Sequence, residues 1–118
     1  MKAITAALVL VALAGAPTGA SAEDNTARFL KLYTDGSSSD RQMVETYLSN
    51  VQTGFYWANR FLEMSDRPKL FCTSDVLTLT GAQLLETVRL QVKADPRGLL
   101  LPLGFTLLVS MQTTYPCK

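Results

Sequence analysis

The chain has 118 residues, of which 47% are hydrophobic and 18% are charged, with a formal net charge of +1. This balanced and evenly spread charge does not indicate nucleic-acid binding or a charged disordered tail. The sequence contains no histidine, which removes the usual general base and the commonest metal ligand.

The segment 1–22 has the three parts of a secretory signal peptide. Lys2 supplies the positive charge, 3–14 is apolar, and Ala20-Ser21-Ala22 is a small-residue cleavage motif. The alternative is an N-terminal membrane anchor, but the apolar stretch is shorter than the roughly 20 residues that span a bilayer. We therefore expect one mature domain at 23–118, not associated with the membrane after cleavage. Without Lys2, its ten basic and ten acidic residues cancel.

Two helices are predicted in the first half of the chain. Residues 23–33 predict a short helix, and 34–38 a loop. A longer helix is expected to start at Ser39, because Ser39 and Gln42 have the spacing of a capping box. Its apolar residues recur at helical spacing on one face: Val44, Tyr47, Leu48, Val51, Phe55, Ala58 and Leu62. Gly54 lies within that stripe, where a missing side chain is expected to allow close approach of another helix.

Three large side chains, Tyr56, Trp57 and Arg60, fall outside the apolar face of the long helix. One interpretation is that the helix is covered on both sides and buries them. The other is a partner-binding or dimer surface, since Trp, Tyr and Arg dominate binding hot spots.

The loop at 65–69 ends the long helix, because Pro68 stops helical continuation and holds Arg67 extended. A stiff loop loses little conformational entropy on binding. Arg67, Pro68 and Lys69 therefore form a second candidate partner-binding surface.

Two further helices are predicted in the second half. Thr80 and Gln83 form a capping box for a helix that runs to about Ala94, and 95–98 forms a turn. The last helix, 102–114, is apolar nearly all round, as is typical of a buried core helix. The expected fold class is therefore all-α, a small bundle of about four helices.

The chain has two cysteines, Cys72 and Cys117. In a small exported domain they are expected to form one disulfide, which pins the end of the last helix to the middle of the chain. The alternative is a redox-active or zinc-binding pair, for which the C-x-x-C spacing and histidines are missing.

No catalytic constellation emerges from the residue inventory. Serine, threonine and cysteine have no histidine to act as their base. Glu45 with Glu63, or Asp66 with Asp75, lack the spacing of a catalytic carboxylate pair, and no phosphate loop or EF-hand is present. The sequence predicts a binding module rather than an enzyme, with no cofactor and no metal.

The chain from Phe71 to Cys117 carries an ordered set of motifs. These are an aromatic–Cys pair, a T-x-x-Q-L helix start, an Asp–Pro turn and an apolar final helix that ends in Tyr–Pro–Cys. They consist of Phe71, Cys72, Thr80, Gln83, Leu84, Asp95, Pro96, Leu107, Leu108, Tyr115, Pro116 and Cys117. In these motifs the chain resembles the amidase-immunity family of type VI secretion (Tai or Rap), and 47–51 with 54–59 resemble that family's Tyr-x-x-Gly-Val helix. The resemblance spans about 27–117.

Two features depart from the family pattern. Many members have an additional cysteine pair in the first half, which this chain lacks, and Asn50 stands where a glycine is frequent. The departures leave the implied helical fold unchanged.

The resemblance implies a periplasmic immunity protein, often a homodimer. Such a protein binds a peptidoglycan amidase effector and blocks its cysteine–histidine active site. On this interpretation the 65–69 loop contacts the effector, and the trio around Trp57 serves self-association or packing. The alternative is a non-enzymatic periplasmic structural or chaperone-like helical protein. A third hypothesis is that the protein is an enzyme.

Overall fold

The computed structural model describes residues 24–74 and 77–118, and the predicted signal peptide at 1–22 lies outside them. The helices in chain order are α1 (Thr26–Asp35), α2 (Ser38–Met64), α3 (Gly81–Ala94), the 3₁₀ helix η1 (Pro96–Leu100) and α4 (Leu103–Thr114). The described residues form no strand, only an isolated bridge between Asn25 and Pro102. The all-α bundle of about four helices is confirmed. No helix in the described ranges is long and apolar enough to cross a membrane.

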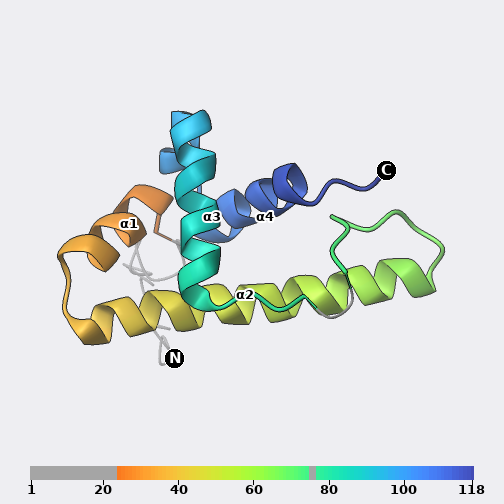
Figure 1. Ribbon diagram of the computed structural model, residues 1–118, viewed down its shortest axis with the longest axis horizontal. Coiled ribbons are helices and arrows are strands. Elements are labelled where there is room, and N and C mark those ends of the chain that lie inside the picture. The colour runs from red at the N-terminus through yellow and green to blue at the C-terminus, as the bar shows by residue number, and fades with distance from the viewer. Residues whose placement is uncertain (1–23, 75–76) are drawn as a thin grey trace, which may run out of the picture.

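The long helix α2 organises the fold, and the other helices lie on one side of it (Figure 1). In that view α1 lies beside the N-terminal part of α2, and α3 rises from the N-terminal half of α2, where Gly81 lies against Glu45. The C-terminal part of α2 extends beyond the other helices. The chain then turns and runs back along α2 to the start of α3. We call this stretch, described at 65–74 and 77–80, the returning segment.

The core forms where α2, α3 and α4 meet. Its buried side chains are Val44, Leu48, Leu84, Leu85, Val88, Leu103, Leu107 and Met111, together with Phe71 from the returning segment. Leu107 is fully buried, whereas Leu108 is half-buried and Phe105 is 51% exposed. The composition of this helix had predicted burial on all sides. That prediction is wrong for one side of α4, which faces outward.

The start of α2 differs from the prediction. Ser37 is the N-cap: its side chain accepts a hydrogen bond from the Asp40 N–H, and the Asp40 carboxylate accepts one from the Ser37 N–H. The predicted capping box of Ser39 and Gln42 is wrong. A carboxylate in the first turn also interacts favourably with the positive end of the helix dipole, which the amide of Gln42 does not. The capping box predicted for the start of α3 is confirmed.

The close approach between helices occurs at Gly81 and not at Gly54. A Cβ at Gly81 would lie 2.5 Å from the Glu45 carbonyl oxygen, so the first turn of α3 touches the backbone of α2. A Cβ at Gly54 would meet nothing within 4 Å. The prediction for Gly54 is wrong, because this residue lies at the edge of the apolar stripe, away from the packed helices.

The predicted disulfide between Cys72 and Cys117 is confirmed, with Cα atoms 4.9 Å apart. The Cys72 N–H donates to the Tyr115 carbonyl oxygen at 2.8 Å, beside the disulfide. These two links fasten the returning segment to the end of α4.

A buried polar contact fixes the start of α1. Thr26 is fully buried, and its N–H donates to the Leu101 carbonyl oxygen at 2.9 Å. Its hydroxyl lies 2.9 Å from the Thr106 hydroxyl, which donates to the Gly98 carbonyl oxygen at 3.1 Å. The first helix therefore begins at Thr26, about three residues later than predicted, where it is bonded to η1 and α4.

Candidate functional site

A Schellman motif ends α2 and sets the direction of the 65–69 loop. Asp66 has a φ of 54°, in the left-handed region. The Arg67 N–H donates to the Leu62 carbonyl oxygen at 2.8 Å, and the Asp66 N–H to that of Glu63 at 3.2 Å. These are the two hydrogen bonds of the motif, with aspartate in the position that glycine usually takes. The helix therefore ends at Met64, four residues before Pro68, and the Schellman motif rather than the proline ends it.

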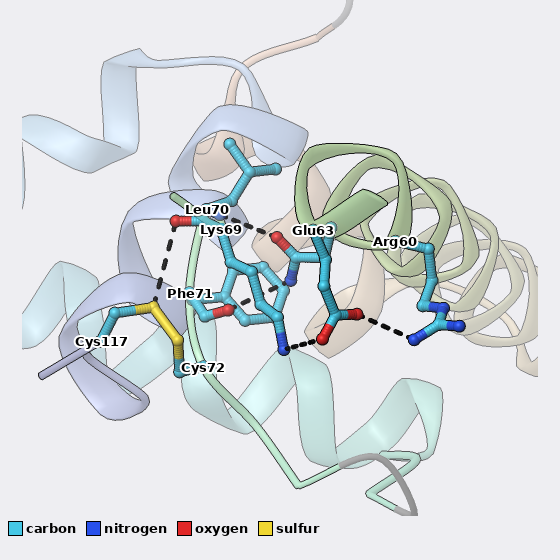
Figure 2. Close-up of polar contacts among 8 residues, drawn as sticks. Arg60, Glu63, Lys69, Leu70, Phe71, Cys72 and Cys117 are labelled. Atoms are coloured by element: carbon cyan, nitrogen blue, oxygen red, sulfur yellow. Dashed lines mark hydrogen bonds and ion pairs between the residues drawn. A yellow bond between two sulfur atoms is a disulfide. The ribbon is translucent and has the colours of Figure 1, made fainter. Parts of the chain in front are cut away.

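The structure joins the two predicted partner-binding surfaces through Glu63, which the sequence analysis had not selected. The Glu63 carboxylate lies 2.8 Å from the Arg60 guanidinium and 3.6 Å from the Lys69 Nζ. Figure 2 shows Glu63 between these two cations, with the disulfide beyond Lys69. Arg67 and Pro68 are both exposed on the same loop. We call Arg60, Glu63, Arg67, Pro68 and Lys69 together the tip surface.

Two amide side chains of α2 hold the returning segment. Asn59 accepts from the Leu70 N–H at 2.7 Å and donates to the Phe71 carbonyl oxygen at 3.2 Å. Two turns earlier, Gln52 makes the same paired contact with the backbone of Leu79, at 3.1 and 2.9 Å. The sequence analysis predicted neither Gln52 nor Asn59 as a contact with the returning segment. The available signal was the spacing of two amide side chains seven residues apart on one face of a helix.

A cavity of about 60 Å³ lies between α2 and the returning segment. Tyr56, Arg60 and Lys69 line it, with Phe71 and Met111 among its apolar lining residues. Its volume is that of a small side chain or a few water molecules, well below the roughly 300 Å³ at which small-molecule sites begin. The cavity therefore suits an inserted side chain of a protein partner better than a metabolite.

Trp57 turns away from this cavity. Its ring meets Tyr56 edge-on, with centroids 5.1 Å apart, and the side chain is 64% exposed. Phe61 and Met64 are exposed beside it. The two-sided burial considered for this helix is therefore wrong for Trp57, because no described helix covers that side of α2.

A second hollow, of about 370 Å³, lies where η1 meets α4, with Leu101, Phe105 and Val109 on its apolar side. Asp95 and Arg97 lie on its rim, 2.8 Å apart. The hydrogen bond from the Arg97 guanidinium lowers the pKa of the Asp95 carboxyl below its ordinary value. This exposed pair contributes little to stability.

The described residues contain no cluster of acidic or cysteine side chains that could hold a metal ion. They also contain no buried side-chain polar atom without a hydrogen-bond partner.

Comparison of the chain with protein-family models, with curated proteins and with solved structures finds no match.

Proposed function

We propose that this chain is a periplasmic immunity protein that binds and inhibits a type VI secreted peptidoglycan amidase, and that it is not itself an enzyme. The observation that carries the proposal is the tip surface, which projects at the end of α2 beyond the other helices (Figure 1). The all-helical fold also agrees with what the sequence resemblance implies.

The loop of the tip surface is fixed at both ends. At its start the Schellman motif holds Asp66 and Arg67. At its end Asn59 holds the backbone of Leu70, and the disulfide of Cys72 follows. A loop fixed in this way loses little entropy when it binds, which favours tight inhibition.

The chemistry of the tip surface suits the mouth of an enzyme cleft. Pro68 and Arg67 are exposed at the turn, whereas the charge of Lys69 is paired with Glu63. We propose that Arg67 contacts an acidic group at the rim of the amidase cleft while Pro68 enters the cleft. The small cavity beside Tyr56 then receives one side chain of the effector.

The experiment that tests this proposal expresses a candidate amidase from the same genome in the periplasm, with and without this protein. Rescue of growth, and copurification of the two proteins, are the expected results. The double variant Arg67→Ala, Lys69→Ala should lose rescue and remain folded. A matched control, Arg28→Ala with Lys93→Ala, removes two exposed cations far from the tip surface and should keep rescue.

Two results would count against the proposal. If no amidase of that genome is bound or neutralised, the immunity function is refuted. If both double variants lose rescue equally, the loop is not the contact surface.

The alternative, a chaperone-like or structural periplasmic protein, is favoured by the exposed apolar side chains of Leu90, Leu100 and Phe105. Such a protein would suppress the aggregation of unfolded clients without any amidase. Loss of that suppression in Leu100→Ser, with amidase rescue unchanged or absent, would support the alternative.

A further inference from the structure

The hollow where η1 meets α4 is large enough for a small molecule. Its volume of about 370 Å³ lies above the roughly 300 Å³ at which small-molecule sites begin, unlike that of the cavity beside Tyr56. One water molecule takes up about 30 Å³ of the liquid, so the hollow has room for roughly a dozen non-hydrogen atoms. That is the size of an aromatic ring with a short polar substituent.

The wall of the hollow on the α4 side is apolar. Phe105 and Val109 lie four residues apart and therefore on the same face of the helix, and Leu101 adjoins them at the turn before it. The Phe105 side chain is 51% exposed, on a helix that contains no charged residue. An exposed phenyl ring of this kind offers an aromatic ligand a stacked or edge-to-face contact.

The floor of the hollow offers no polar group to a ligand. Gly98 and Thr106 line it, and both are buried. The Thr106 hydroxyl donates to the Gly98 carbonyl oxygen at 3.1 Å and lies 2.9 Å from the Thr26 hydroxyl, so its hydrogen bonds are made within the fold. The apolar part of a ligand therefore faces inward, and its polar part faces the rim.

The rim carries a carboxylate and a guanidinium that neutralise each other. The Arg97 Nε and Nη2 donate to the Asp95 Oδ1 and Oδ2 at 2.9 and 2.8 Å, and the Arg97 backbone N–H donates to Oδ1 at 3.2 Å. The guanidinium has further N–H groups, and Oδ2 has a further lone pair, for one more partner. Gln91, the other polar residue at the rim, is uncharged.

This rim selects an uncharged polar group. An ion would be attracted by one member of the Asp95–Arg97 pair and repelled by the other, and it would lose hydration on entering the hollow. An amide has no charge and places an acceptor beside a donor. Its carbonyl oxygen can accept from the Arg97 guanidinium while its N–H donates to the Asp95 carboxylate, and hydrogen bonds to charged groups are the stronger ones.

We propose that the hollow between η1 and α4 binds an uncharged small molecule made of an aromatic ring and an amide group. The ring lies against Phe105, and the amide lies on the Asp95–Arg97 pair. The proposal depends on this hollow and not on the amidase, because the tip surface lies at the end of α2. A chain that neutralises an amidase but binds no such ligand would refute it and leave the proposed function in place.

The first test is an NMR titration of the disulfide-bonded protein with phenylacetamide. Saturable shifts are expected in the backbone amides of η1 and the first turns of α4, with a Kd on the order of 1 mM at usual ligand efficiencies. Phenylacetate and phenylethylammonium have nearly the same shape but carry a charge, and should bind at least about fivefold more weakly. Shifts that do not saturate, or equal binding of all three compounds, would overturn the proposal.

Two aromatic truncations locate the site. Phe105→Ala should weaken phenylacetamide binding by about threefold or more, because the ring contact is lost. Phe61→Ala is the matched control, since it truncates an exposed phenyl ring on α2 and should leave the binding unchanged. An equal effect of the two variants would place the ligand elsewhere and contradict the proposal.

The last test reverses the charge preference of the rim. Arg97→Ala leaves the Asp95 carboxylate unpaired and should make phenylethylammonium the best ligand of the three. Asp95→Asn leaves the Arg97 guanidinium unpaired and should make phenylacetate the best. Circular dichroism verifies that both variants are folded. Variants that keep the wild-type order of the three compounds would overturn the proposal, and so would binding of a phenylalanine-containing peptide without binding of phenylacetamide.

Discussion

The contact between Gly81 and Glu45 fixes where α3 crosses α2, and Gly81→Ala tests how closely the two helices are packed. The added Cβ would lie 2.5 Å from the Glu45 carbonyl oxygen and 2.6 Å from its Cβ. These atoms belong to the α2 backbone or lie directly on it, so no rotation of a side chain relieves the overlap. The whole first turn of α3 has to move.

The expected cost follows from what moves with that turn. Leu84, Leu85 and Val88 lie on the same helix and are buried in the core. Shifting them out of a packed interior costs about 1–3 kcal/mol, as other overpacked cores do. Alanine is a better helix former than glycine, which offsets part of this loss by at most about 1 kcal/mol. We expect Gly81→Ala to lower the free energy of unfolding by about 1–2 kcal/mol.

Gly54→Ala is the matched control, because the same chemical change occurs in open space. Its Cβ meets nothing within 4 Å, so the variant should gain about 0.5–1 kcal/mol of stability. Urea unfolding followed by circular dichroism measures both variants. The midpoints should shift in opposite directions with unchanged m-values. A Gly81→Ala variant as stable as the wild type would refute the close crossing of α2 and α3.

Further predictions concern the core, the disulfide and one tyrosine. Leu107→Ala should cost about 2–5 kcal/mol in urea unfolding, since the side chain is fully buried; a loss below about 0.5 kcal/mol would mean that α4 is peripheral. Replacing Cys72 and Cys117 by serine opens a crosslink across 45 residues and should cost about 4 kcal/mol. Thiol titration of the denatured wild type should find no free thiol, and two thiols would contradict the pairing. The hydroxyl of Tyr33 donates to the Glu45 carboxylate at 2.7 Å, which raises the pKa of the Tyr33 phenol above its ordinary 10.0. A phenol with a higher pKa in the folded state stabilises the fold below pH 10 and loses that contribution as the pH rises through the folded value. Alkaline spectrophotometric titration should therefore find a lower Tyr33 pKa in Glu45→Ala, and an unchanged one would exclude the hydrogen bond as the cause.

The features that the sequence predicted well are local or obligatory. The start of α3 follows from Thr80 and Gln83, which lie three residues apart and need no tertiary contact. The disulfide followed because Cys72 had one possible partner in the chain. The class of fold followed from helical periodicity, a signal contained within each segment.

The features that the sequence analysis missed are of two kinds. Some depend on contacts between distant segments, and one depends on a choice between two equally suitable local residues. Ser37 and Ser39 are both suitable N-caps, and the choice fell to the one with a carboxylate three residues later. In the sequence, Gly81 is an ordinary first residue of a helix, and only the folded structure shows that the α2 backbone lies against it. In the sequence, nothing distinguishes Asn59 from a solvated amide. Its hydrogen-bond partners, Leu70 and Phe71, come close to it only because the chain reverses after α2.

The candidate site was predicted in its parts but not in its assembly. The loop was selected for the stiffness that Pro68 gives it, and Tyr56, Trp57 and Arg60 were selected for their residue types and their place outside the apolar face of the helix. Glu63 was considered only as half of a catalytic carboxylate pair with Glu45, yet it is the residue that brings Arg60 and Lys69 together. The contact between Glu63 and Lys69 cannot be read from the sequence, because it depends on the Schellman turn that reverses the chain after Met64.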